Sequence, residues 1–484
     1  MKNNVVGNLA WRFFERCGAQ IVTFVVSVVL ARLLDPSVYG TVALVTVFTN
    51  IMQVFIDSGM GNALIQKKNA DDLDFSSVFY FNLLVCVCLY GLMFFCAPLI
   101  AGFYEMPELI PVIRVLSLVL VISGLRNIQQ AYVSRNMLFK RFFFSTIAGT
   151  LSAAVVGIGM AYCGFGIWAL VAQYLVKATV DAAILWITVK WRPQKLFSMW
   201  RLKGLFSYGW KLLVSSLIDV TYNDLRQLII GKLYTAEDLA YYNRGKQMPN
   251  LIVSNVNSSI DSVLLPTMSA EQDNTTRVRE MTRLAIKTST YIMAPLMMGL
   301  ASVAEPLIKL LLTEKWLPSV PFMQIFCITY MFYPIHTANL NAIKAMGRSD
   351  LFLKLEIIKK AVGMAALLST MWFGVEIMAY SLLLTSVTGQ IINSWPNKKL
   401  LEYSYLDQLK DILPSIALAV FMGGCVYCVS FLGMNDLLTL LIQILLGAAI
   451  YIGGSMLFKL ESFIYLMDMV KRLLGKLRRK GKRG

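Results

Sequence analysis

The sequence predicts an all-α polytopic membrane protein with about 14 transmembrane helices. Of its 484 residues, 57% are hydrophobic and only 15% are charged, whereas soluble proteins average about 25% charged residues. The apolar residues gather in runs of about 20, the length that a helix needs to cross a hydrocarbon core about 30 Å thick. The connections between these runs are short, so none of them can hold a separate catalytic domain.

The expected spans follow one another closely along the chain. In order, they cover residues 12–30, 40–62, 76–100, 109–130, 142–162, 165–189, 207–231, 247–268, 284–304, 318–342, 351–373, 376–396, 411–432 and 436–458. The stretches from Arg114 to Arg126 and from Lys211 to Arg226 are the least apolar. The count of 14 therefore depends most on the fourth and seventh spans.

Basic residues alternate between the connections. The connection after the sixth span holds Lys190, Arg192 and Lys195, whereas residues 163–166 and 374–376 hold no Lys or Arg. Because basic connections stay in the cytoplasm, we expect both termini there, as an even number of spans also requires. The net charge of +17 reflects this pattern.

The C-terminal segment, residues 461–484, is expected to be a cytoplasmic basic tail. Its last 14 residues, KRLLGKLRRKGKRG, hold eight basic residues and no acidic residue. Such a tail can bind anionic lipid headgroups electrostatically, or it can simply anchor the topology. Binding to nucleic acid is not expected, because the chain shows no folded basic domain.

A weak internal repeat has a period of about 200 residues. Trp11 precedes a span that ends in ARLLDPSVYG, and Trp210 precedes a span that ends in GKLYTAEDLAYY, so that Arg32 aligns with Lys232. Six spans in each half would give both halves the same orientation, as in transporters built from parallel repeats. The predicted organisation is a six-helix lobe at 1–200, a second at 201–400, two additional helices at 401–460, and the tail.

Charged residues inside the spans need an explanation, because a charge at the bilayer centre costs roughly 2.5–3.5 kcal/mol on insertion scales. We expect them to line a hydrated cavity, where cations would receive an anionic headgroup; arginine suits phosphate because its planar fork donates two hydrogen bonds at once. The candidate cations are Arg12, Arg16, Lys177, Lys211 and Arg226. The acids that are candidates for coupling transport to H⁺ or Na⁺ are Asp57, Asp181, Asp219, Asp224 and Asp261.

Simpler roles for the same charges remain open. Lys177 and Asp181 are four residues apart on one helix face, where a local ion pair would only lower the cost of insertion. Arg12 and Lys211 lie near span ends, from which their long side chains can reach the cytoplasmic interface. Asp224 is two residues from Arg226 and points to another helix face, so each needs its own partner or water.

The sequence holds no recognisable catalytic or metal-binding motif. A GxxxxGK[ST] phosphate loop is absent, and with His336 as the single histidine no two-histidine metal site can form. Asp72 and Asp74 have the DxD spacing of metal-dependent glycosyltransferases but lie in a short loop, where a solvated acidic turn explains them. Cys425 and Cys428 form a CxxC on an apolar helix without a second pair, which is typical of buried filler. We therefore expect neither an enzyme nor a cofactor.

The order of several motifs resembles a known family. ARLLDPSVYGTVALVTVFTNIMQVFIDSGMGNALIQ, RNIQQAYVSRNMLFKR, WALVAQYLVKATVDAAILW, NDLRQLIIGKLYTAEDLAYYNRGKQMPNL, AEPLIKLLLTEKWLPSV and AIKAMGRSDLFLKLEIIKK together resemble the polysaccharide-export branch of the multidrug/oligosaccharidyl-lipid/polysaccharide (MOP) flippase superfamily. Asp57, Gly59 and Gln66 sit at positions where that family tends to have an acid–x–Gly and a terminal Ile-Gln. One departure is Thr235-Ala236 where the first repeat has Asp35-Pro36.

This resemblance implies two six-helix lobes plus two C-terminal helices, and transport by alternating access. The likeness is to flippases for O-antigen, colanic acid and teichuronic acid repeat units. It implies an undecaprenyl-pyrophosphate-linked oligosaccharide as cargo. It also implies a location in a bacterial cytoplasmic (inner) membrane, with other polysaccharide-assembly proteins as further partners. The alternatives are a MATE-type drug/cation antiporter, whose cavity should favour acids, and a membrane-embedded polymerase or ligase of lipid-linked sugars, which should have a large external loop. A scaffold subunit, which needs no cavity charge, is a third alternative.

Overall fold

The computed structural model describes residues 2–57, 60–67 and 70–481 of the chain. Within these ranges, side chains are described except at residues 2–17, 62, 66, 207–208 and 473–481. The described residues form nineteen α-helices and two short 3-10 helices, and they include no strand. The expected all-α class is confirmed.

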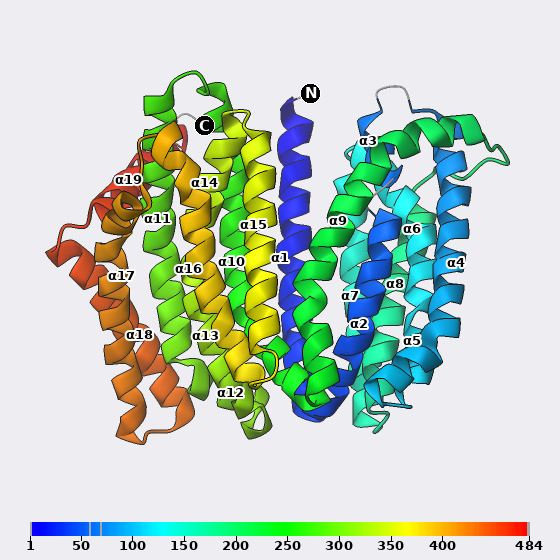
Figure 1. The fold of residues 1–484 in the computed structure, drawn as a ribbon, viewed down its shortest axis with the longest axis horizontal. Helices are drawn as coiled ribbons and strands as arrows, with labels where there is room; N and C mark the ends of the chain where they lie inside the picture. Colours follow the sequence, from blue (N-terminus) through cyan, green and yellow to red (C-terminus); the bar gives the residue numbers. More distant parts are fainter. Residues whose placement is uncertain (1, 58–59, 68–69, 482–484) are drawn as a thin grey trace. The chain divides into compact units, whose positions relative to one another are not determined.

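The first of two compact units covers residues 1–240. Most of its long helices run side by side along one common direction, whereas the start of α9 lies across them (Figure 1). They are α1 (Lys2–Leu33), α2 (Pro36–Asp57), α3 (Met60–Gln66), α4 (Asp72–Tyr104), α5 (Leu109–Leu116), α6 (Leu118–Arg135), α7 (Phe139–Tyr162), α8 (Ile167–Thr188) and α9 (Met199–Leu233). Within this unit α1 packs on α7, α7 packs on α8, and α9 packs on α2, α3 and α4.

The second unit covers residues 241–484. It holds most of α10 (Ala236–Ala270), then α11 (Thr275–Ser302), α12 (Ala304–Leu312), η1 (Glu314–Ser319), α13 (Val320–Met331), α14 (Tyr333–Ala345), α15 (Ser349–Thr370), α16 (Val375–Leu400), α17 (Tyr405–Cys428), η2 (Val429–Leu432), α18 (Asp436–Leu457) and α19 (Glu461–Gly481). In this unit α11 packs on α13, α14 and α17, and α15 packs on α16. The segment expected as a basic tail is the helix α19, which packs on α11.

Every expected span falls on a helix or on a short series of helices. Among the described residues, nine helical segments are long and apolar enough to cross a membrane by themselves. The other five expected spans fall on α1, α9, α10, the consecutive helices α13 and α14, and α15. These segments are more polar or are broken into short helices. They therefore need water or other helices, rather than lipid alone, around part of their surface.

The helix breaks match the internal repeat. The first break separates α1 from α2 at residues 34–35, and the corresponding break separates α9 from α10 at residues 234–235. Later elements keep a similar offset: α7 begins at residue 139 and α15 at residue 349, while α8 begins at 167 and α16 at 375. A duplicated six-helix design would give such offsets, and the duplication itself stays a prediction. The lobe boundaries at 1–200, 201–400 and 401–460 stay a prediction.

Close packing keeps α9 in the first unit. A Cβ atom on Gly40 of α2 would lie 1.7 Å from the carbonyl oxygen of Ala236, and a Cβ on Gly231 of α9 would lie 2.1 Å from a methyl group of Leu44. Only glycine allows such an approach of one helix to another. The end of α9 and the first turn of α10 are consequently held against α2.

Candidate functional site

An ion pair between two expected spans is the centre of a polar cluster in the first unit. Arg126 of α6 and Asp181 of α8 form this pair, with 2.7 Å between Nη1 and Oδ2. Their side chains are 25% and 11% exposed. Ser145 of α7 donates a hydrogen bond to the carbonyl oxygen of Asp181 at 3.1 Å. The cluster therefore joins three neighbouring helices through groups that an apolar interior would not retain unpaired.

The next residue of α6 reaches a second acid. Asn127 donates from Nδ2 to Asp57 Oδ1 at 2.9 Å and to the carbonyl oxygen of Ile56 at 2.9 Å. Gln53, one turn before Asp57 on α2, donates to the same Oδ1 at 3.0 Å. Consecutive helix residues point about 100° apart. For this reason Arg126 and Asn127 bridge α6 to two different helices, α8 and α2.

Lys177 completes the cluster from α8. It precedes Asp181 by one helical turn, is exposed, and interacts electrostatically with both Asp181 and Arg126. The structure thus brings together four charges of the first unit: Arg126, Lys177, Asp57 and Asp181. Two cations and two carboxylates balance one another, and an incoming anion would compete with the carboxylates for the cations.

The candidates on α9 occupy different environments. Arg226 is buried, with 8% of the residue exposed, whereas Lys211 and Asp219 are exposed. Asp219 accepts a hydrogen bond from Asn223 at 3.5 Å, and Asp224 accepts one from Gln227 at 2.9 Å. None of these contacts joins α9 to the cluster of α2, α6 and α8. Their proposed roles stay predictions.

Three candidates lie elsewhere. Arg12 and Arg16 belong to α1 but fall among the residues whose side chains lie outside the described set, so their roles also stay predictions. Asp261 lies in the second unit on α10, where its Oδ1 accepts a hydrogen bond from Asn341 Nδ2 of α14 at 2.6 Å. It therefore stabilises a contact between two helices and is exposed at the same time.

A neutral polar face on α10 was not predicted from the sequence, because the predicted site residues are all charged. Its exposed members lie within the expected span 247–268: Ser254, Asn255, Ser258, Ser259 and Ser262. Each of the four serine hydroxyls donates to a carbonyl oxygen of its own helix, as Ser259 does to Asn255 at 2.8 Å. Their oxygens stay available as acceptors. The spacing of Ser and Asn in VSNVNSSIDS is the sequence signal for this face. The amides of Gln53 and Asn127 beside Asp57 were likewise not predicted.

Asp72 and Asp74 do not lie in a loop, as expected, but in the first turn of α4, where the protein's own side chains bind them. Asp72 accepts hydrogen bonds from Trp191 Nε1 at 3.1 Å and Gln194 Nε2 at 3.3 Å, and the buried Asp74 pairs with Lys67 at 2.6 Å. The DxD spacing here serves the packing of helix ends. Within the described part of the chain, no group of three or more His, Cys, Asp or Glu residues is placed to hold a metal ion.

The fold is that of a known flippase. The structure superimposes on the solved lipid II flippase MurJ in an inward closed conformation with a TM-score of 0.76 at 16% identity, covering 94% of this chain and 99% of that chain. A multidrug resistance MATE family transporter of the MOP superfamily, in an inward-facing conformation, gives a TM-score of 0.59 at 14% identity, covering 80% and 96% of the two chains. At these identities the similarity establishes the fold alone.

Sequence comparison identifies the family. The chain is 26% identical over 416 residues to the teichuronic acid biosynthesis protein TuaB of Bacillus subtilis (strain 168), covering 84% of this chain and 85% of that protein. The family model described as "Polysaccharide biosynthesis protein" matches residues 29–321, which is more than half of the chain. The resemblance predicted from the motifs is confirmed: the chain belongs to the family of polysaccharide biosynthesis proteins.

Proposed function

We propose that the protein is a flippase, which moves an undecaprenyl-pyrophosphate-linked oligosaccharide repeat unit across the bacterial cytoplasmic membrane for cell-surface polysaccharide biosynthesis. The observation that carries this proposal is the polar cluster of Arg126, Asp181, Lys177 and Asp57 on helices that otherwise suit lipid. A group of charges inside the membrane-spanning part marks a path for a polar cargo. Membership of a polysaccharide biosynthesis family and a MurJ-like fold support a lipid-linked sugar as that cargo.

The two ends of such a cargo need different chemistry. The pyrophosphate carries negative charge, which Arg126 and Lys177 would bind in exchange for part of their interaction with Asp181. Sugar hydroxyls need neutral hydrogen-bond donors and acceptors instead of charges. The polyprenyl tail would remain in the lipid while the headgroup crosses. Release is favoured because the carboxylates compete with the pyrophosphate for the same cations.

Coupling to H⁺ or Na⁺ would act through an acid whose charge state affects the cluster. Asp57 suits this role, because its Oδ1 is held by two side-chain amides and it interacts electrostatically with Arg126. Protonation of Asp57 would remove one of the two negative charges that balance the cations. Asp181, Asp219, Asp224 and Asp261 remain further candidates. A transport rate that is independent of both pH and sodium would exclude this coupling.

Transport can be measured directly in proteoliposomes that contain a polyprenyl-pyrophosphate oligosaccharide and a membrane-impermeant probe of the sugar. We expect sugar to appear in the opposite leaflet only when the protein is present. The translocation rate should fall about tenfold or more in Arg126→Gln, because a charge-assisted contact of about 1.5–3 kcal/mol is removed. Arg16→Gln and Arg226→Gln test the other predicted cavity cations. Arg348→Gln is the matched control, because Arg348 lies outside the expected spans and pairs with Asp350 at 2.9 Å.

The competing functions give different results in the same vesicles. Efflux of cationic dyes without sugar translocation would assign the protein to drug/cation antiport and make the acids the residues to study. Lengthened or newly ligated sugar chains would indicate a polymerase or ligase. A scaffold subunit would translocate nothing, and neutralising Arg126 would change nothing.

A further inference from the structure

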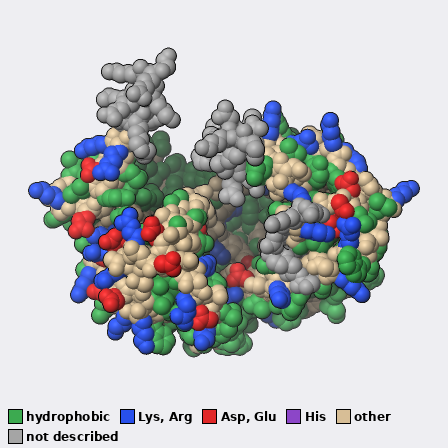
Figure 2. Space-filling model, turned by 90° about the horizontal axis from the view of Figure 1, so that it is seen from above, with side chains coloured by type: hydrophobic (Ala, Val, Ile, Leu, Met, Phe, Trp, Pro, Cys, Tyr) green, Lys and Arg blue, Asp and Glu red, His purple; other side chains and the backbone are tan. Residues whose placement is uncertain are grey.

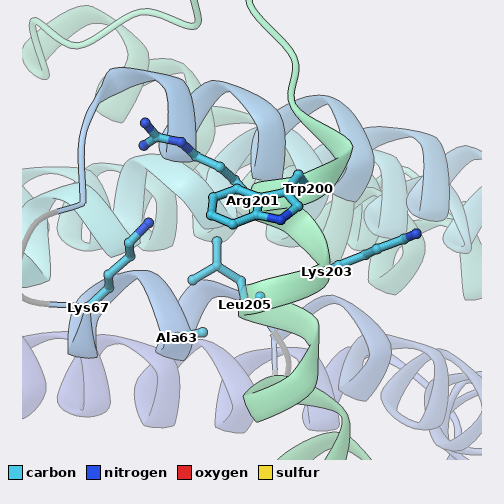
Figure 3. A pocket seen from close by; sticks show the side chains of 7 residues that line it. Ala63, Lys67, Trp200, Arg201, Lys203 and Leu205 are labelled. Atoms are coloured by element: carbon cyan, nitrogen blue, oxygen red, sulfur yellow. The ribbon is translucent and has the colours of Figure 1, made fainter.

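A basic pocket lies at one end of the first unit, where the short helix α3 follows the end of α2. It has a volume of about 850 Å³ and is formed by the end of α3 and the first turns of α9. Figure 3 shows the Lys67 side chain on the same side of α9 as Arg201, with the indole of Trp200 and the Leu205 side chain beside them. Lys203 leaves α9 in another direction. In Figure 1 this end of the unit also holds the N-terminal end of α1.

The positive charges of the pocket are only partly balanced by neighbouring carboxylates. Lys67 pairs with Asp74 at 2.6 Å, and Arg201 pairs with Asp71 at 2.6 Å and with Asp74 at 3.3 Å. An ammonium group has three donors and a guanidinium group has five, so both cations retain N–H groups for a further anion. Lys203 is exposed and forms no ion pair with any described residue. Three cations therefore face two carboxylates.

The surroundings of the pocket are apolar and exposed. Trp200 is 82% exposed, and four further large apolar side chains of the same segment are also exposed: Leu196, Phe197, Met199 and Phe206. Tryptophan together with basic residues is enriched where a membrane protein meets the headgroup layer. A soluble anion would need only the cations, whereas this combination fits a ligand that has both a phosphate and acyl chains.

We propose that this pocket binds an anionic phospholipid of the surrounding membrane. Its phosphate would accept hydrogen bonds from Arg201 and Lys67, Lys203 would add long-range attraction, and the upper part of the acyl chains would lie along Trp200 and Leu205. Figure 2 views this end of the molecule and shows Lys and Arg side chains, with some Asp and Glu, on its surface. The bound lipid would fix the start of α9 at the membrane interface. The site is independent of the transported cargo.

Lipid retention tests the proposal. Full-length protein is extracted from vesicles of equal parts phosphatidylglycerol and phosphatidylcholine, and the lipids that remain bound are counted by native mass spectrometry. We expect a preference for phosphatidylglycerol that falls about fivefold for each basic residue removed in Lys203→Gln and Arg201→Gln. Lys398→Gln is the matched control: an exposed lysine at the end of α16 in the second unit, outside the pocket.

A second variant separates binding from folding. Lys203→Gln combined with Trp200→Ala leaves the pairs of Arg201 with Asp71 and Asp74 intact, so its melting temperature should match that of the wild type while phosphatidylglycerol retention falls. The proposal is overturned if this variant and Arg201→Gln both retain phosphatidylglycerol like the wild type. It is also overturned if inorganic phosphate binds in a variant-sensitive manner while phosphatidylglycerol and phosphatidylcholine are retained equally, because the site would then hold a free anion.

Discussion

At the scale of single residues, two neighbouring side chains of α6 organise the polar cluster. Arg126 reaches Asp181 on α8, and Asn127 reaches Asp57 on α2. Both acids fall inside expected spans, and Arg126 ends one of the two least apolar stretches. Lys177 is the local partner expected for Asp181, because residues four apart share a helix face. The ion pair with Arg126 spans 55 positions in the chain, and no local pattern reveals such a partner.

The strength of this pair can be measured by a double-mutant cycle. Arg126→Gln should destabilise the protein by about 2 kcal/mol, because it leaves Asp181 charged in a largely buried position. Adding Asp181→Asn should recover part of this loss, since no uncompensated charge remains. The measurement is the free energy of unfolding of the four proteins in detergent. Strictly additive effects of the two substitutions would show that the pair makes no net contribution.

At the scale of helices, the N-terminal cap of α4 also links this helix to α9. Asp71 and Asp74 form a reciprocal capping box: the side chain of Asp71 accepts from the Asp74 N–H at 3.0 Å, and the side chain of Asp74 accepts from the Asp71 N–H at 3.2 Å. Arg201 of α9 then binds the same two carboxylates. A local cap is thereby joined to a helix that begins more than 120 residues later.

The cap predicts a pH dependence. The hydrogen bond from the Asp74 backbone N–H, followed by the Arg201 guanidinium, lowers the pKa of Asp71 below its ordinary value of 3.8. A carboxyl with a lowered folded-state pKa stabilises the fold above its unfolded pKa, and this contribution is lost as the pH falls through the folded pKa. Asp71→Ala should therefore cost about 1 kcal/mol near pH 7.

The difference in unfolding free energy between wild type and Asp71→Ala should shrink below about pH 4. Thermal unfolding of both proteins between pH 3 and pH 7 measures it. A constant difference over this range would mean that the carboxylate charge at Asp71 contributes nothing. Glu108→Ala is a suitable control, because Glu108 precedes α5 without a side-chain cap hydrogen bond.

At the scale of the whole molecule, the alternating basic connections predict that the start of α9 faces the cytoplasm and the end of α4 faces the opposite side. In a cysteine-free variant, Lys203→Cys should react with a membrane-impermeant maleimide only from the cytoplasmic side, and Glu105→Cys only from outside. Labelling of inverted and right-side-out vesicles makes the comparison. The reversed pattern would overturn the predicted orientation of both termini.

The sequence by itself determined the all-α class, the positions of the spans and the family, because apolar length and motif order are local properties of the chain. The helix breaks at residues 34–35 and 234–235 fall within the gaps expected between spans, 31–39 and 232–246. Only the tertiary structure decided which polar groups meet: Arg126 with Asp181, Asn127 with Asp57, and Arg201 with Asp71. Each of these contacts depends on how separate helices pack, which no local pattern in the sequence specifies.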